Sequence, residues 1–368
     1  MLVPLVLLLL DLARDRGVFC WTRHDLTGRL VVITGAAGGL GRQLALEFAM
    51  RGAVLALWDV RKDALHTCVE WLEACGVPRS SVHVFVVDVA DAAAVRATAQ
   101  SQLATLGPAS VVVSNAAVVN GEPLLQASEE RLRASFAINA LSHVWLARAL
   151  VPQLATSPMG ANVAKPGGVF VTIGSLMAEL PAAGLVDYCA SKAAVRQLHE
   201  CLRWEQPGRG DGGDVGGPTG RSVHCLHVQP YMIDTPLFAG GQPGRFRWVR
   251  ALLPPLGAAT VARRIADAVE TRRDRIVIPY ILKWLPPLLQ LLPDVVRDVA
   301  LDLAGAECAM NRFVGGAARA VCLDDGSAAA VPPPRRLAHT SPRPARSPSR
   351  SPAVHARSRP TAARGRRA

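Results

Sequence analysis

Short apolar runs alternate with longer stretches of helical periodicity along residues 30–279. The apolar runs are rich in β-branched residues and end at turn residues, which predicts buried strands. These predicted strands are Leu30–Thr34, Val54–Asp59, Val82–Asp88, Ala109–Asn115, Gly168–Gly174, Ser222–Gln229 and Arg275–Pro279. The stretches between them predict helices over Gly41–Arg51, Lys62–Cys75, Ala92–Leu106, Glu129–Leu154, Asp187–Trp204 and Thr260–Arg272. Such alternation predicts an α/β fold with one doubly wound parallel sheet of about seven strands and helices on both faces.

The 368 residues therefore divide into one catalytic domain with appendages. We expect a short apolar N-terminal segment over 1–25, the catalytic domain over 26–282 and an apolar extension over 283–320. An Arg/Pro/Ser-rich tail over 321–368 cannot bury apolar surface and is predicted to be disordered.

The formal net charge of +12 is concentrated in that tail, since residues 326–368 hold ten arginines and no acidic residue. The remainder carries only +2, so no specific nucleic-acid partner is predicted. The tail is interpreted as a solvated extension, or as a phosphorylatable segment that binds anionic surfaces. The eight cysteines form no CxxC pair and have no histidine at ligand spacing, which predicts no metal site and a reducing, cytosol-facing compartment.

Two apolar segments suggest contact with a membrane. Residues 2–10 are too short to span a bilayer, so they are interpreted as a shallow anchor or a frayed apolar terminus. Residues 276–293 contain one charge, Lys283, between Tyr280 and Trp284, and several prolines. This segment is typical of one that lies in a bilayer interface or covers a lipophilic substrate entrance; the alternative is a core strand that continues into a surface helix.

A glycine-rich motif, Thr34-Gly35-Ala36-Ala37-Gly38-Gly39-Leu40-Gly41, lies between the first predicted strand and helix. Glycines at this place let the backbone approach a pyrophosphate at the helix N-terminus, which indicates a Rossmann-type dinucleotide site. The second strand ends in Asp59, where a carboxylate can bind both ribose hydroxyls and repel a 2′-phosphate. This favours NAD, although Arg42 and Arg61 are near enough in sequence to favour NADP.

A second motif, Tyr188-Cys189-Ala190-Ser191-Lys192, places a phenol and an ammonium one helical turn apart. The cation is expected to lower the pKa of the Tyr188 phenol, as acid–base catalysis on an alcohol or ketone requires. The chain has three tyrosines and four lysines in all, and this motif uses one of each. Ser175, at the end of the fifth strand, can direct its hydroxyl to the same substrate oxygen.

Together these motifs resemble those of the short-chain dehydrogenase/reductase family over roughly residues 26–280. The resemblance implies that Ser175 orients the substrate, Tyr188 exchanges its proton, Lys192 lowers the tyrosine pKa and binds the nicotinamide ribose, and Asn139 supports a proton-relay water. It implies that the cofactor, NAD or NADP, is bound by Thr34, Gly35, Gly39, Leu40, Gly41, Asp59, Asp88, Val89, Asn115, Ala116, Tyr188, Lys192, Pro230 and Thr235. Two motifs depart from the family pattern: the NNAG motif reads Ser114-Asn115-Ala116-Ala117, and Pro230 is followed by Tyr231, which is expected to narrow the nicotinamide end, in place of a glycine.

Within the family the chain is similar to the membrane-associated branch of retinol dehydrogenase 10, the epidermal retinol dehydrogenases and dehydrogenase/reductase member 3. The likeness rests on Leu57-Trp58-Asp59, the segments 115–119, 187–192 and 230–238, and Met310-Asn311-Arg312-Phe313. It implies a lipophilic alcohol substrate, retinol first and a hydroxysteroid or long-chain alcohol second. Apolar residues expected to cap this substrate are Phe238, Phe246, Trp248, Leu252 and Leu253.

The branch also implies the cytosolic face of the endoplasmic reticulum or lipid droplet, with the cytoplasm as the alternative. A homodimer is compatible with the family. The hypothesis from a different class is a non-catalytic membrane-surface adaptor that retains the fold.

Overall fold

The computed structural model describes residues 23–157, 167–206, 223–241, 251, 253–307 and 309–314. The predicted N-terminal segment up to residue 22, the predicted tail, and the expected substrate-capping residues Phe246, Trp248 and Leu252 lie outside these described residues.

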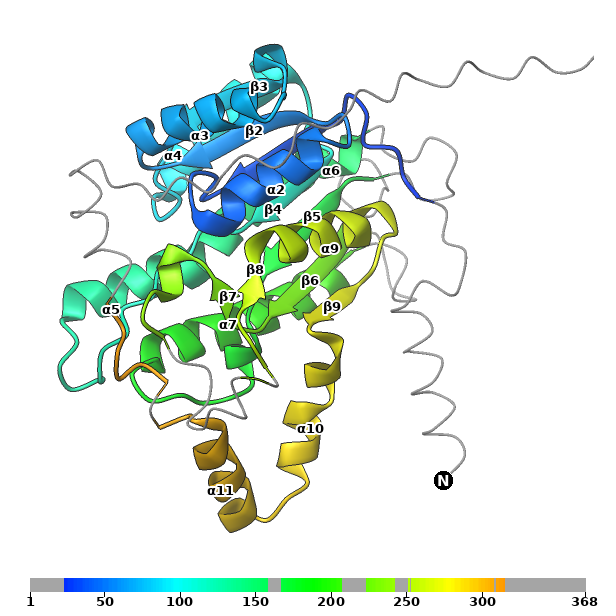
Figure 1. Cartoon of the computed structure of the whole chain (residues 1–368). Coiled ribbons are helices and arrows are strands. Elements are labelled where there is room, and N and C mark those ends of the chain that lie inside the picture. The colour runs from blue at the N-terminus through cyan, green and yellow to red at the C-terminus, as the bar shows by residue number, and fades with distance from the viewer. Residues whose placement is uncertain are drawn as a thin grey trace, which may run out of the picture. The chain divides into compact units, whose positions relative to one another are not determined.

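Seven parallel strands form the central sheet in the order β3-β2-β1-β4-β5-β6-β9 (Figure 1). The predicted doubly wound α/β fold is confirmed, and each predicted strand is present with small changes at its ends. The strands are β1 Leu30–Thr34, β2 Val54–Asp59, β3 Val82–Val86, β4 Val111–Ser114, β5 Val169–Ile173, β6 His224–Pro230 and β9 Arg275–Ile278. The order reverses between β1 and β4, and the crevice at the carboxyl ends of these two strands is the usual ligand site of such sheets.

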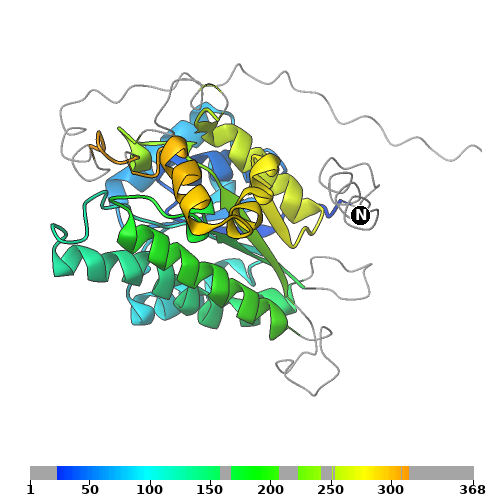
Figure 2. The same cartoon turned by 90° about the horizontal axis from the view of Figure 1, so that it is seen from below.

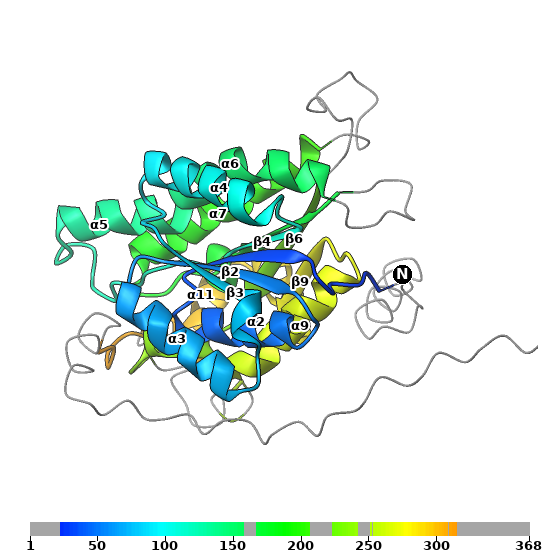
Figure 3. The ribbon, with the colours of Figure 1, turned by 90° about the horizontal axis from the view of Figure 1, so that it is seen from above.

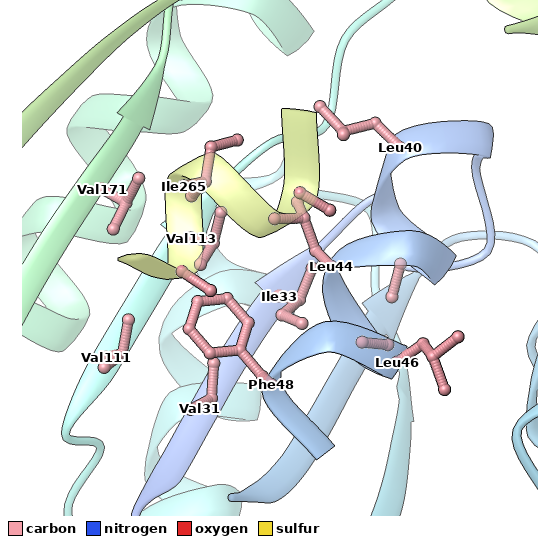
Figure 4. Close-up of a cluster of buried hydrophobic side chains, with 14 of the residues drawn as sticks. Val31, Ile33, Leu40, Leu44, Leu46, Phe48, Val111, Val113, Val171 and Ile265 are labelled. Atoms are coloured by element: carbon pink, nitrogen blue, oxygen red, sulfur yellow. The ribbon is translucent and has the colours of Figure 1, made fainter. Parts of the chain in front are cut away.

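Helices cover both faces of the sheet (Figures 2 and 3). They are α2 Gly39–Ala49, α3 Lys62–Ala74, α4 Ala92–Leu106, α5 Glu129–Phe136, α6 Ser142–Thr156, α7 Val186–Trp204 and α9 Ala258–Glu270. Alternate residues of β1 face opposite layers: Val31 and Ile33 join the apolar cluster with α2 and α9 (Figure 4), whereas Val32 joins the cluster with α4 and α6. Near-continuous apolar strands are what a sheet buried on both faces requires.

The predicted helix Glu129–Leu154 is interrupted by the π-helical turn η2, Ala137–Leu141. At this turn the Ser142 hydroxyl donates to the Ile138 carbonyl (2.6 Å), and the buried Asn139 side chain bonds both backbone groups of Val118. These side-chain hydrogen bonds compete with the regular helical ladder. A periodicity argument cannot detect such a turn, because the apolar spacing continues through it.

Beyond the main sheet, two short strands, β7 Ile233–Asp234 and β8 Leu256–Gly257, pair in parallel. After β9 the chain forms the short helices η5 Tyr280–Lys283 and α10 Leu285–Gln290, and then α11 Asp294–Ala304. Figure 1 shows α10 and α11 projecting from the body as a helical hairpin. Residues 306–314 then return to the carboxyl end of the sheet.

Candidate active site

The glycine-rich turn after β1 leaves no room for a side chain at Gly39 or Gly41. Gly35 has a left-handed backbone (φ +61°), and a Cβ on Gly41 would overlap the Gly35 carbonyl. A Cβ on Gly39 would lie 2.9 Å from Thr235 Cβ. No side chain caps the start of α2, so its first N–H groups face this turn. The bare backbone and the helix N-terminus therefore fit the pyrophosphate of a dinucleotide.

Hydrogen bonds join this turn to the end of β4. The Thr34 hydroxyl accepts from the backbone N–H groups of Asn115 (3.0 Å) and Ala116 (3.1 Å). The Asn115 amide donates to the Thr34 carbonyl over 2.9 Å. These contacts fix the two strand ends at the point where the strand order reverses.

Asp59 ends β2 beside the same turn and is buried. Its carboxylate accepts from the Ala37 backbone N–H (3.1 Å) and from Arg61 Nε (3.1 Å). The structure thus brings the residue expected to favour NAD into contact with one expected to favour NADP. Arg42 lies instead over the ring of Trp71, 5.7 Å from its centroid. Farther along the crevice, Val89 is buried and Asp88 is exposed.

The helix α7 carries Tyr188 and Lys192, and both side chains are almost fully buried. The Lys192 ammonium donates to the Ile173 carbonyl at the end of β5 (3.0 Å) and lies 5.8 Å from the centroid of the Tyr188 ring. Ser175 follows β5, and its hydroxyl makes a side-chain hydrogen bond with Tyr188. The structure therefore brings the predicted serine, tyrosine and lysine together.

Burial is the strongest electrostatic influence on both groups. It raises the pKa of the Tyr188 phenol, and the hydrogen bond from Ser175 opposes this rise. Burial also lowers the pKa of Lys192 to about 8, because the charged ammonium is desolvated. The expected lowering of the tyrosine pKa by Lys192 is not among the causes that act on the phenol in this structure, and it stays a prediction.

Asn139 lies near Tyr188 and Lys192, because its side chain contacts α7. Besides its two bonds with Val118, its amide lies 3.2 Å from the Ser191 hydroxyl, next to Lys192. The π-helical turn therefore fixes the side chain of Asn139 between the segment that follows β4 and the helix α7.

At the opposite side of the crevice, Pro230 ends β6 and Thr235 follows β7, where it contacts Gly39. Tyr231 is half-buried and packs against the cluster of Leu176, Val277 and Leu282. Its ring thus lies among residues of β9 and η5, and the expected narrowing of the nicotinamide end stays a prediction.

Two features of the site have no clear sequence signal. Three buried histidines, His143 on α6, His199 on α7 and His227 on β6, lie inside the protein, and burial lowers the pKa of each. Residues 306–314 pack on the Tyr188 side of the site, although only a resemblance singles out Met310 and Phe313 in the sequence. The described residues contain no group of three or more His, Cys, Asp or Glu side chains able to hold a metal ion.

Comparison with known proteins agrees with this geometry. The chain is 32% identical to short-chain dehydrogenase/reductase 3 of Homo sapiens over 293 residues, which cover 79% of this chain and 88% of that protein. It is 30% identical to human epidermal retinol dehydrogenase 2 (79% and 87% covered) and to mouse 17-beta-hydroxysteroid dehydrogenase 13 (70% and 76% covered).

Among solved structures, a short-chain dehydrogenase/reductase from Burkholderia phymatum in complex with NAD aligns with a TM-score of 0.59 and 27% identity, covering 76% of this chain and 96% of that one. A metagenomic short-chain oxidoreductase in complex with NADP has the same fold (TM-score 0.52, 22% identity, 69% and 97% covered). The short chain dehydrogenase family model matches residues 29–243. The chain therefore belongs to the short-chain dehydrogenase family and is an oxidoreductase that acts on an alcohol or carbonyl with a nicotinamide cofactor.

Proposed function

We propose that this enzyme interconverts a lipophilic alcohol and its carbonyl, with retinol and retinaldehyde as the first candidate pair. The observation that carries this proposal is the apolar surroundings of the catalytic phenol. Tyr188 belongs to a buried cluster with Val119, Leu185 and Met310, and its ring meets the edge of Phe238 at 5.7 Å. Such a surface favours an apolar ligand over a polar one. The similarity to an epidermal retinol dehydrogenase supports the same substrate class.

In this proposal Ser175 orients the substrate oxygen, and Tyr188 takes the hydroxyl proton as the alcohol is oxidised. A bound nicotinamide would supply the hydride acceptor for the carbinol carbon, and the hydride donor for the reverse direction. Lys192 holds a positive charge near the phenol, anchored by the Ile173 carbonyl, and stabilises the phenolate. The fixed amide of Asn139 keeps the π-helical turn in place for a proton-relay water. The alcohol loses one hydride to the cofactor and one proton to Tyr188, so the oxidation is balanced.

NAD is the first candidate cofactor and NADP the alternative. The carboxylate of Asp59 can accept from ribose hydroxyls, and its charge repels a 2′-phosphate. Arg61 opposes that repulsion, since its guanidinium contacts the same carboxylate.

We further propose that the enzyme works at a membrane or lipid-droplet surface, on the cytosolic side of the endoplasmic reticulum, with a cytoplasmic location as the alternative. The segment of η5, α10 and α11 supports this, because large apolar residues along it are exposed to solvent: Ile281, Leu288, Leu291, Val295, Val296 and Val299. Within the described residues, Glu129–Thr156 is the one helical stretch long and apolar enough to cross a bilayer. It packs on the sheet through Leu146, Leu150 and Leu154, as a core helix does.

Two other functions compete with this proposal. A hydroxysteroid or long-chain alcohol would suit the same apolar surroundings, and the similarity to a hydroxysteroid dehydrogenase favours a test of that class. A non-catalytic adaptor would keep the fold but would not need the buried Ser175, Tyr188 and Lys192 arrangement.

The experiment is a steady-state assay of the full chain in detergent or vesicles, with retinol, a hydroxysteroid and a long-chain alcohol, each with NAD and NADP. We expect turnover of retinol that Tyr188→Phe reduces by a factor on the order of 10³ or more, since the variant removes the acid–base group. Tyr280→Phe is the matched control, because Tyr280 lies after β9 and outside the catalytic group. If the enzyme turned over the hydroxysteroid but not retinol, the hydroxysteroid would become the first candidate substrate. No turnover of any of the three substrates, in wild type as in Tyr188→Phe, would support the adaptor.

A further inference from the structure

Residues 306–307 and 309–314, which we name the strap, connect two loops on either side of Tyr188. At the start of the strap, the Ala306 carbonyl accepts from the Ala183 backbone N–H (2.8 Å), in the loop that precedes α7. At its far end, the Val314 N–H donates to the Ala239 carbonyl (3.1 Å), directly after the short helix η4, Pro236–Phe238. Figure 1 shows the strap as the orange segment that returns from α11 towards α5. The strap is therefore held by backbone hydrogen bonds at both ends.

Three glycines provide the space in which the strap lies. A Cβ on Gly121 would overlap the ring of Phe313, and a Cβ on Gly240 would overlap the Arg312 carbonyl. A Cβ on Gly184 would lie 3.0 Å from Met310 Cβ. Each of these glycines also has a positive φ, between 69° and 81°, which disfavours any other residue. Three separate loops are thus shaped to accept consecutive parts of the strap.

The strap side chains pack directly against the catalytic tyrosine. Met310 is 7% exposed and belongs to the same buried cluster as Tyr188, Val119 and Leu185. Phe313 packs against this cluster together with Phe238. Because Ser175 and Lys192 occupy the polar side of the phenol, the apolar side is the one that the strap covers.

We propose that the strap is the substrate-facing wall of the active site, and that Met310 and Phe313 select apolar alcohols of extended shape. This inference rests on the proposed function. A substrate hydroxyl must come within hydrogen-bond reach of Tyr188, so the carbon chain attached to it runs along the surface that these two side chains form. Methionine adapts its shape to a ligand at little cost, whereas the phenylalanine ring offers a rigid apolar face. Small polar alcohols gain nothing from this wall and bind weakly.

The test compares retinol with a short primary alcohol in Met310→Ala and Phe313→Ala. We expect kcat/KM for retinol to fall by roughly tenfold or more while kcat/KM for the short alcohol stays constant or rises, because the lost contacts serve the long chain alone. Met50→Ala, an exposed methionine at the end of α2, is the matched control and should leave both values unchanged.

A purely structural strap would lower kcat/KM for both alcohols in equal proportion, with a lower melting temperature, and this result would overturn the proposal. Where an alanine variant does not fold, Met310→Leu and Phe313→Leu keep the comparison possible. Failure of the proposed function has a different signature, namely that wild type turns over no alcohol at all. In that case retinol binding to the cofactor-loaded protein, followed by fluorescence, decides the question: unchanged affinity in the strap variants would exclude the wall.

Discussion

The imidazole rings of His199 and His227 stack with their centroids 5.0 Å apart, one from α7 and the other from β6. Nδ1 of His199 also lies 2.9 Å from the Thr172 hydroxyl on β5. Burial lowers the pKa of His199 to about 4 and holds the pKa of His227 well below its ordinary value. Both rings are therefore neutral near pH 7, and His199 bonds Thr172, the neighbour of Ile173, whose carbonyl accepts from Lys192.

The first prediction follows from these neutral rings and from His143, whose pKa burial also lowers. Below pH 6.5 the unfolded chain binds protons at these histidines that the folded chain does not bind, and for His199 this difference persists down to about pH 4. The free energy of unfolding should therefore fall on acidification across this window, by roughly 1.4 kcal/mol per pH unit for each ring. Urea unfolding at pH 7.5, 6.0 and 5.0 measures the slope.

His143→Leu tests the assignment, because neither ring nitrogen of His143 has a hydrogen-bond partner among the described residues. The variant should show a shallower slope and lose little stability at pH 7.5. His66→Leu is the control, since His66 is exposed and solvated in the folded and unfolded chain alike. An identical slope in wild type and His143→Leu would contradict the prediction.

The second prediction concerns Lys192, whose pKa burial lowers to about 8. The side chain is charged below that pH and neutral above it, so any cofactor contact that needs the ammonium weakens as the pH rises through about 8. We expect the Kd of the cofactor to rise between pH 7 and 9.5. In Lys192→Arg the charge persists, so the Kd should be weaker but independent of pH over this range. A wild-type Kd that stays constant would refute the assignment.

A third prediction uses the contact between Asp59 and Arg61. Asp59→Asn removes the negative charge that repels a 2′-phosphate, so the ratio of kcat/KM for NADP over NAD should rise about tenfold, equivalent to about 1.4 kcal/mol. Arg61→Ala should move the ratio in the opposite direction, because the carboxylate then lacks its cation. Arg79→Ala, an exposed arginine paired with Glu73, is the control. If both variants shifted the NADP over NAD ratio in the same direction, Asp59 and Arg61 would not be the residues that determine cofactor preference.

The fourth prediction concerns α11, none of whose residues is buried. Val295, Val296, Val299 and Leu303 are all at least 43% exposed and follow helical spacing, so they can enter a lipid surface together. Val295→Asp with Val299→Asp should reduce the fraction that floats with vesicles by several-fold and leave the melting temperature unchanged. Asp298→Asn, a charge change on the same helix, is the control. Equal flotation of wild type and both variants would show that α11 does not bind the lipid surface.

Sequence reasoning predicted the sheet well because each strand is buried on both faces and reads as a continuous apolar run. It also predicted the proximity of Ser175, Tyr188 and Lys192, since strand ends meet at one edge of the sheet and i, i+4 residues share a helix face. It missed the π-helical turn at Asn139, whose bonds to Val118 arise only after folding. The contact of Phe313 with Gly121 was hidden for a similar reason: no local pattern pairs two loops so distant in the chain.

That long separation has a consequence for synthesis. All seven strands and every proposed catalytic group precede residue 279, whereas Met310 and Phe313 leave the ribosome later. A nascent chain can therefore form the glycine-rich turn before Met310 and Phe313 cover the apolar side of the Tyr188 ring. Such a surface is prone to aggregation until the last contact closes. A chain truncated before residue 306 would keep every proposed catalytic group, but this apolar surface would remain exposed.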